Sequence, residues 1–302
     1  MVAQHTLLPD GRWHFHHGPM DIIIGADGRA TAVAAAHASA WMRFKEILDE
    51  LVQELPGLRR QVDGDCSLRG PIARRMWLAC LPHSNSFITP MAAVAGAVAQ
   101  ELIACYSQDG VTRAWINNGG DIALHLAPTQ SLRVGLYADL ACLNLEELRN
   151  GIDTDGRFEV TSSMPVRGVA TSGWRGRSFS LGIADSVTVL ARTAAAADAA
   201  ATVIANAVNI DDARIVRRPA CEVKDDADLG CIPVTVGVPP LEPSLVQRAL
   251  RAGLDWAQKL REDRLIWSAV LVCQNQIATT DTANMTTTRS RRALADADLA
   301  IA

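Results

Sequence analysis

The stretch Ala114-Trp115-Ile116-Asn117-Asn118-Gly119-Gly120-Asp121-Ile122-Ala123-Leu124 places two asparagines, two glycines and an aspartate between two short apolar runs. Such a pattern is typical of the tight turn of a β-hairpin, because glycine adopts positive φ without steric cost. The flanking residues therefore predict strands over 112–117 and 121–126. Two adjacent glycines also let a ligand approach the backbone closely, beside the carboxylate of Asp121.

The composition excludes several classes of protein. Of the 302 residues, 49% are hydrophobic, which is ample for a buried core in one large domain or two small ones. The net charge of −4 gives no basic footprint for nucleic acid. Seven cysteines without a CxxC pair argue against a disulfide framework. No leader pattern and no apolar run of about 18 residues is present, so we expect a soluble cytoplasmic protein outside the membrane.

Residue spacing predicts hairpin strands separated by long helices. This order favours an α+β fold with helices on one face of an antiparallel sheet. We expect a single domain over 1–277, in which 1–60 can form a hairpin-and-helix subdomain, a polar connection over 142–157, and a mobile tail over 278–302. Helices are predicted over 30–55, 72–81, 90–106, 194–208 and 243–261, and further strands over 12–16, 20–25, 132–137, 179–183, 187–192, 233–238 and 265–273.

Two further stretches carry polar groups suited to a ligand. Thr171-Ser172-Gly173 is followed by Trp174, Arg175 and Arg177, which combines hydroxyls, an aromatic ring and positive charge within a few residues. The alternative is a turn with a purely structural role. For the Gly119-Gly120-Asp121 segment the alternative is equally plain: a tight hairpin in which Asp121 bonds to its own loop.

Asp198 and Thr202 stand four residues apart on a predicted helix. They project from one helix face, one turn apart, so that a carboxylate and a hydroxyl can reach one hard cation such as Mg²⁺. The alternative is a solvated pair or a local hydrogen bond.

The three stretches together resemble the ApbE family of FAD:protein FMN transferases, and most closely its shorter, functionally uncharacterised cytoplasmic branch. The GGD turn, the TSG turn and the AD-x-x-x-T helix carry the resemblance, over roughly 70–240. It implies an ApbE-like, T-fold-related antiparallel sheet packed with helices. It also implies FAD or FMN bound by Asn118, Gly119, Gly120, Asp121, Thr171, Ser172, Gly173 and Arg175, and Mg²⁺ held by Asp198, Thr202 and the backbone carbonyl of Ala93.

Two departures bear on activity. Transferases of the family have a Lys-Gly pair where this chain has Ala95-Gly96, and a histidine-containing segment where 178–186 has no histidine. We therefore expect loss of protein flavinylation, although Asp185 offers a partial replacement. No catalytic residue is assigned, and an enzyme that transfers or hydrolyses a phosphate-linked group stays one hypothesis. A non-catalytic or accessory pterin-, purine- or flavin-binding protein is the second, and a structural homo-oligomer the third.

Outside these stretches, Arg74 and Arg75 are adjacent on the predicted helix 72–81. An arginine pair of this kind can guard an anionic ligand, or it can be a solvated helix face or part of an ion pair.

Overall fold

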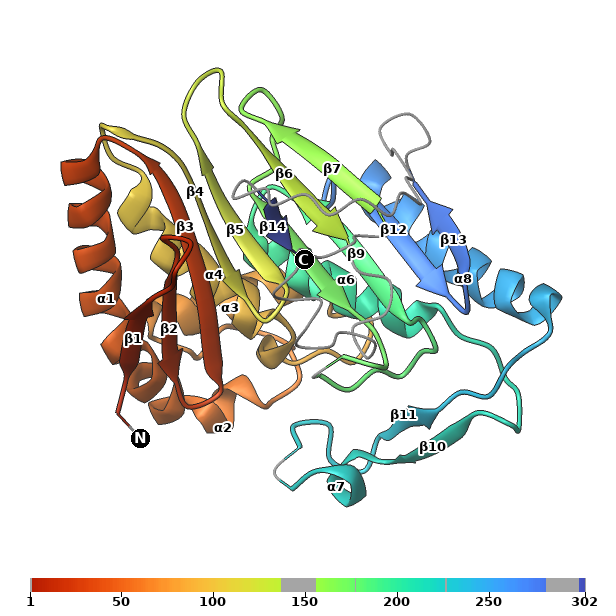
Figure 1. Cartoon of the computed structure of the whole chain (residues 1–302). Helices are drawn as coiled ribbons and strands as arrows, with labels where there is room; N and C mark the ends of the chain where they lie inside the picture. The colour runs from red at the N-terminus through yellow and green to blue at the C-terminus, as the bar shows by residue number, and fades with distance from the viewer. Residues whose placement is uncertain (1, 137–155, 177, 226, 281–298, 302) are drawn as a thin grey trace.

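The computed structural model describes residues 2–136, 156–176, 178–225, 227–280 and 299–301. It has the α+β architecture that the sequence predicts, with helices packed on an antiparallel sheet (Figure 1). Arg177 and nearly all of the predicted 142–157 connection lie outside the described residues.

A sheet of nine strands forms the centre of the molecule, and every neighbouring pair in it is antiparallel. The hairpin strands β4 and β5 stand in the middle, so their turn lies at the end of the central strands. In spatial order the strands are β1 (Gln4–Leu7), β2 (Trp13–His17), β3 (Met20–Gly28), β4 (Val111–Asn118), β5 (Asp121–Leu126), β8 (Gly168–Ser172), β9 (Ser186–Ala191), β12 (Ser268–Cys273) and β13 (Gln276–Thr279).

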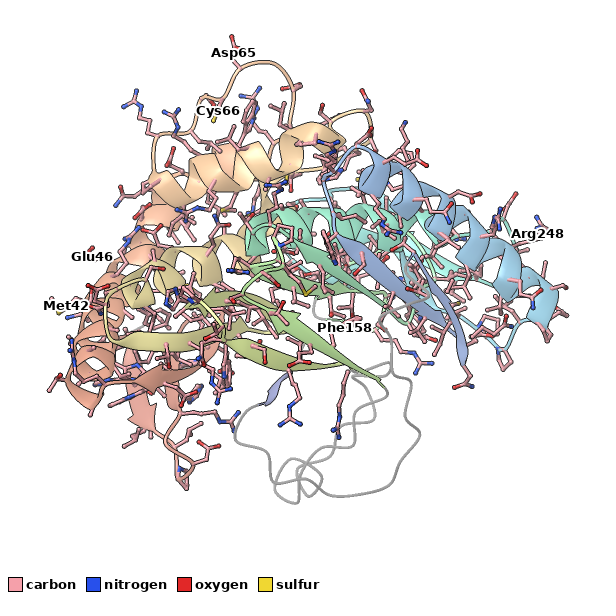
Figure 2. All side chains as sticks on the ribbon, turned by 90° about the horizontal axis from the view of Figure 1, so that it is seen from above. Met42, Glu46, Asp65, Cys66, Phe158 and Arg248 are labelled. Carbon is pink, nitrogen blue, oxygen red and sulfur yellow. The ribbon has the colours of Figure 1, made fainter. Side chains whose placement is uncertain are left out.

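One face of this sheet is covered by helices, as Figures 1 and 2 show from two directions. Apolar residues at three- and four-residue spacing bury one side of α1, at Ala36, Ala40, Phe44 and Ile47. The main helices are α1 (Ala30–Gln53), α3 (Pro71–Cys80), α4 (Val94–Ile103), α6 (Ala194–Ala207) and α8 (Pro243–Glu262). Short helical segments are α2 (Leu55–Leu58), η1 (Leu81–His83), η2 (Pro90–Ala93), η3 (Ala104–Tyr106) and α7 (Ala220–Val223).

The other face carries a small sheet of three strands: β14 (Leu299–Ile301), β6 (Ser131–Leu136) and β7 (Gly156–Thr161). A second apolar core lies between the two sheets, with Leu132 and Val160 on one side and Ile122 and Leu124 on the other. Figure 2 shows the small sheet and the helices on opposite sides of the main sheet. The main sheet is therefore buried on both faces at its centre.

An arm, seen below the body of the protein in Figure 1, is inserted between α6 and α8 and consists of β10 (Val216–Pro219), α7 and β11 (Pro233–Gly237). It returns to the body of the protein through a hydrogen bond of 2.7 Å, in which the Thr89 hydroxyl donates to the carboxylate of Asp228. Thr89 directly precedes η2, so the arm contacts the segment that leads into α4.

The predicted strand over 179–183 is wrong, because this segment is irregular. Its backbone bonds chiefly to the end of α6: the N–H of Leu181 donates to Asn206 Oδ1, and that of Ile183 donates to the Val208 carbonyl. The Ser180 carbonyl also accepts a hydrogen bond from the N–H of Thr235 in β11, but no regular pairing with that strand forms. Gly182 lies so close to the same helix end that an added Cβ would stand 2.0 Å from the Ala205 carbonyl oxygen.

The predicted tail over 278–302 contributes β14, which pairs in parallel with β6. Residues 281–298 and 302 lie outside the described part of the chain, so the domain boundary at 277 stays a prediction. The elements of the predicted subdomain over 1–60 are joined to the main body: β1, β2 and β3 belong to the nine-stranded sheet, and α1 packs into the apolar core on its helical face.

Candidate functional site

The turn between β4 and β5 has the conformation that its glycines predict. Gly119 has a φ of 68° and Gly120 a φ of 109°, so both residues occupy the region that favours glycine. The side-chain oxygen of Asn117 accepts a hydrogen bond of 2.8 Å from the N–H of Gly120. This bond fixes the turn and the directions of the two residues that flank it, Asn118 and Asp121.

Both flanking side chains are buried, and each bonds to another element. The Asn118 amide donates to the Ala95 carbonyl of α4 at 3.2 Å. The Asp121 carboxylate accepts from the N–H of Thr171 in β8 at 3.2 Å. Asp121 therefore forms a hydrogen bond outside its own hairpin. The alternative from the sequence, in which Asp121 bonds only to its own loop, does not describe this contact.

Asp198 reaches the same region from α6. Its Oδ2 accepts a hydrogen bond of 2.9 Å from the N–H of Gly96, and its Cβ would stand 2.9 Å from a Cβ added at Gly96. The added Cβ would also meet the Ala194 carbonyl oxygen at 2.3 Å, so only glycine allows α4 and α6 to cross this closely. Ala95 and Gly96 thereby link the hairpin turn to the α6 carboxylate.

The carboxylates of Asp121 and Asp198 interact with one another. Burial is the main cause that raises the pKa of Asp121 well above its usual range, and the negative charge of Asp198 adds to it. Burial likewise raises the pKa of Asp198 to about 7, against the hydrogen bonds from the Gly96 and Ala95 backbone, which lower it. Two neighbouring ionised carboxylates with little water around them are costly, so this pair favours a proton or a cation between them.

The other predicted metal ligands lie close to Asp198 and Ala95 along the chain. Thr202 is half-buried, one turn after Asp198 on α6. Ala93 is fully buried and ends η2 directly before α4, two residues from Ala95. Within the described residues, no three His, Cys, Asp or Glu side chains gather in a metal-binding cluster. A cation here would instead depend on carboxylate, hydroxyl and backbone oxygens.

The Thr171-Ser172-Gly173 segment is the end of a strand rather than a free turn. The Thr171 hydroxyl lies 2.9 Å from that of Thr188 on β9, and Ser172 is half-buried as the last residue of β8. Gly173 follows, and a Cβ there would stand 2.3 Å from the backbone oxygen of Asp185.

Asp185 organises the residues after this strand end. Its carboxylate forms an ion pair of 3.3 Å with Arg175 and accepts hydrogen bonds from the Trp174 indole at 3.3 Å and from the N–H of Gln274. The Arg175 guanidinium also lies over the Trp174 ring, 5.2 Å from its centre. Asp185 thus anchors the predicted phosphate-binding arginine, a structural role that its sequence position did not indicate.

Three participants were missed at the level of the sequence: the backbone N–H of Gly96, the Ala95 carbonyl and the Thr188 hydroxyl. Backbone groups carry no sequence signature of their own. The run of small residues in α4 was the available signal, because it predicts a helix that another element approaches closely. Thr188 stands in a strand that is buried along its whole length, which does not distinguish it.

The protein is thus an α+β protein in which a hairpin turn, a strand end and two helices bring two buried carboxylates together. A model of the family described as AbpE bacteria matches residues 5–279, and the chain belongs to that family. The UPF0280 protein of Methanopyrus kandleri is 36% identical over 211 residues, which cover 68% of this chain and 78% of that protein. The UPF0280 protein of Methanothermobacter thermautotrophicus is 36% identical over 60% of this chain and 68% of its own length.

Similar solved structures include proteins named as flavin transferases. The ApbE protein of Thermotoga maritima has a TM-score of 0.45 at 12% identity, covering 93% of this chain and 97% of that one. The apo form of the Pseudomonas stutzeri flavinyl transferase ApbE has a TM-score of 0.42 at 11% identity, with coverage of 93% and 95%. Among the described residues, no helix of this chain combines the length and apolar character of a membrane span.

Proposed function

We propose that this protein binds a flavin-type nucleotide together with Mg²⁺ at the site where Asp121 and Asp198 meet. The observation that carries the proposal is the convergence of four segments through hydrogen bonds: the hairpin turn to α4, α4 to α6, and the turn to β8. Membership of the AbpE bacteria family and the flavin transferases among the similar structures support the choice of nucleotide.

The residues fit a divalent cation. Two buried carboxylates repel one another when both are ionised, and a cation between them would relieve that repulsion. Asp198, Thr202 and the carbonyl of Ala93 would hold the metal, with Asp121 as its neighbour. When bound, Mg²⁺ would neutralise the phosphates of the nucleotide.

The remaining residues would position the nucleotide. The positive φ of Gly119 and Gly120 leaves backbone without Cβ atoms at the turn, so that a ring or ribose can lie against it. Arg175 would bind a phosphate from its position beside Asp185, and Ser172 would offer a hydroxyl at the strand end. A general base is missing from this set, so binding is proposed ahead of group transfer.

Titration calorimetry with Mg²⁺ and FAD tests the proposal, using Asp198→Asn because the amide oxygen preserves the acceptor for the Gly96 N–H. We expect wild type to bind the pair and to gain about 3 kcal/mol in unfolding free energy when the ligand exceeds its Kd about a hundredfold. Asp198→Asn should lose at least about tenfold in Mg²⁺ affinity, because a charged ligand of the metal is removed.

Asp255→Asn is the matched control. Asp255 is an exposed residue of α8 paired with Arg251, and its substitution removes the same charge from a helix that carries none of the site residues. If Asp198→Asn and Asp255→Asn both bind Mg²⁺ as wild type does, the metal assignment is wrong. If Mg²⁺ binding is lost but FAD binding is unchanged in every variant, the nucleotide occupies another site.

Incubation of FAD with the protein and Mg²⁺ separates binding from turnover. Intact FAD at the end of the incubation supports the binding role. If FMN or AMP is released by wild type and not by Asp198→Asn, the binding role is wrong and the protein transfers or hydrolyses a phosphate-linked group.

A further inference from the structure

A groove of about 670 Å³ opens between α3 and the first turn of α6, apart from the residues of the carboxylate site. Its volume is within the range of pockets that hold small molecules. Arg69, Arg74 and Arg75 line one side, and Gln100 of α4 and Thr193 line the other. The lining includes no carboxylate.

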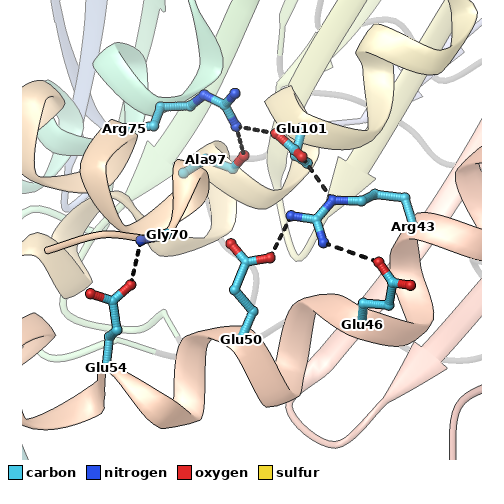
Figure 3. A network of polar contacts seen from close by, with 8 residues as sticks. All are labelled: Arg43, Glu46, Glu50, Glu54, Gly70, Arg75, Ala97 and Glu101. Atoms are coloured by element: carbon cyan, nitrogen blue, oxygen red, sulfur yellow. Dashed lines mark hydrogen bonds and ion pairs between the residues drawn. The ribbon is translucent and has the colours of Figure 1, made fainter.

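Arg75 forms the fixed inner wall of the groove. Its guanidinium donates to Glu101 at 2.8 Å and to the Ala97 carbonyl at 3.3 Å, and Glu101 also binds Arg43 (Figure 3). The carboxylate of Glu54 accepts from the N–H groups of Arg69 and Gly70, which fixes the backbone before α3. The nearby acidic side chains are thus bound to other partners.

The guanidinium groups of Arg69 and Arg74 differ from that of Arg75. Both side chains belong to exposed residues, and neither guanidinium makes a hydrogen bond or ion pair with any described residue. Two such cations on one wall of a groove attract an anion, and guanidinium matches the oxygens of phosphate geometrically.

The opposite wall presents hydrogen-bond donors. The Gln100 side-chain oxygen accepts from the N–H of Ala195 at 3.3 Å, which leaves the amide nitrogen of Gln100 as the donor. The Thr193 hydroxyl oxygen accepts from the N–H of Ala196 at 3.2 Å, so its proton is the part available to a ligand. Since both acceptor oxygens are already used, this wall favours a ligand that accepts hydrogen bonds.

The remaining lining is apolar. Leu78 is 58% exposed, and Pro71 and Ala79 of α3 also line the groove. We propose that the groove binds a phosphorylated small molecule, with its phosphate on Arg69 and Arg74 and its apolar part on Leu78 and Pro71. The proposal does not depend on nucleotide binding at Asp121 and Asp198, because none of its residues belongs to that site.

Two probes separate the polar and apolar parts of the groove: inorganic phosphate and phenyl phosphate, titrated into the full chain with EDTA present to remove metal ions. We expect millimolar or tighter binding of phosphate, and several-fold tighter binding of phenyl phosphate because its ring covers Leu78. The double variant Arg69→Gln/Arg74→Gln should lose at least about tenfold in affinity for both probes.

Leu78→Glu is the second variant. It places a carboxylate four residues after Arg74 on α3, where it pairs with Arg74 and repels phosphate, and an exposed position tolerates the change. We expect an unchanged melting temperature and loss of binding of both probes. The charge-matched control is Arg248→Gln/Arg251→Gln on α8, which should bind as wild type does.

Three results would overturn the proposal: no binding of either probe to wild type in the millimolar range, equal loss in the α8 control, or unchanged binding in both groove variants. If Arg69→Gln/Arg74→Gln has a lower melting temperature than wild type, its loss of binding could come from unfolding, and the affinity of Leu78→Glu then decides. Equal affinities of phosphate and phenyl phosphate would remove the apolar part of the proposal.

Discussion

At the scale of single residues, Gly96 determines how closely α4 and α6 cross. Its N–H holds Asp198, and the space where a side chain would begin is filled by the Ala194 carbonyl. Gly96 therefore has two roles: its missing side chain allows the two helices to pack closely, and its N–H orients the Asp198 carboxylate.

Gly96→Ala should lower the free energy of unfolding by about 2 to 4 kcal/mol, because the new methyl group forces the two helices apart. Urea denaturation monitored by circular dichroism measures the change. Gly237→Ala is the control, since an added Cβ there meets its nearest neighbour at an ordinary 3.5 Å. Equal stabilities of the two variants would show that the crossing is looser than described.

His83 is a second residue with a measurable consequence. It is 4% exposed, its Nδ1 bonds to no described residue, and burial lowers its pKa to about 4. The neutral form is thus preferred in the folded state, whereas the unfolded chain takes up a proton near pH 6.5.

The contribution of His83 to stability should be independent of pH above about 6.5 and should fall as the pH drops from 6.5 to 4. The loss approaches about 3 kcal/mol as an upper bound, since one pKa unit corresponds to about 1.4 kcal/mol. Denaturation curves at a series of pH values test this. His83→Gln should flatten the slope in this window, and His16→Gln, at a less buried position, should keep it; a wild-type slope in His83→Gln contradicts the assignment.

At this scale the sequence predicted local structure, while the roles of the site residues stay predictions. Asp198 and Thr202 lie one turn apart on α6, as their spacing predicted, and Gly119 and Gly120 form the predicted hairpin turn. The partners of Asp198 were not readable, because backbone groups of Ala95 and Gly96 reach it only through the crossing of two helices.

At the scale of elements, the arm of β10, α7 and β11 carries two thiols close together. The Sγ atoms of Cys221 and Cys231 lie 3.8 Å apart, and both residues are exposed. Cys221 lies in α7 and Cys231 lies two residues before the start of β11, so a bond between the sulfurs would close a short loop within the arm.

Treatment of the protein with diamide should join Cys221 and Cys231 in a disulfide, with reduction of the diamide and loss of two hydrogen atoms from the protein. Mass spectrometry of tryptic peptides under non-reducing conditions detects the cross-link. Cys231→Ser should abolish it, and Cys66→Ser should not affect it. A cross-link in Cys231→Ser, or none in wild type, would refute the expected proximity.

Elements were predictable where one face is regularly apolar. The spacing of apolar residues located α1, α6 and α8 to within a few residues, because burial against the sheet selects that spacing. The same reasoning failed for 179–183, where apolar alternation reflects packing against the end of α6 rather than a strand.

At the scale of the whole molecule, the two sheets share one apolar core. Leu132 of β6 is 2% exposed and belongs to the core that lies against β5 and β9. The stability of the small sheet is therefore coupled to that of the main sheet.

Leu132→Ala should cost about 2 to 5 kcal/mol and should shift one cooperative unfolding transition as a whole. Differential scanning calorimetry measures both quantities. Met42→Ala serves as the control, because Met42 is 57% exposed on α1 (Figure 2) and its loss leaves no cavity. A separate early transition in Leu132→Ala would show that the small sheet unfolds independently.

The class of fold followed from the sequence, but the order of the strands did not. Hairpin neighbours such as β4 and β5 are local and carry turn signals. The pairing of β5 with β8, or of β9 with β12, joins distant segments and depends on the collapse of the entire chain.

The pairing of β3 with β4 has a kinetic consequence. β3 ends at Gly28 and β4 begins at Val111, so α1, α3 and α4 must be accommodated before these neighbours can join. Contacts of such long range slow folding because the entropy of closing the loop is lost first. The Asp121–Asp198 region needs both this pairing and the docking of α6, so we expect it to form late in folding, and in a nascent chain only after synthesis has passed the end of α6 at Ala207.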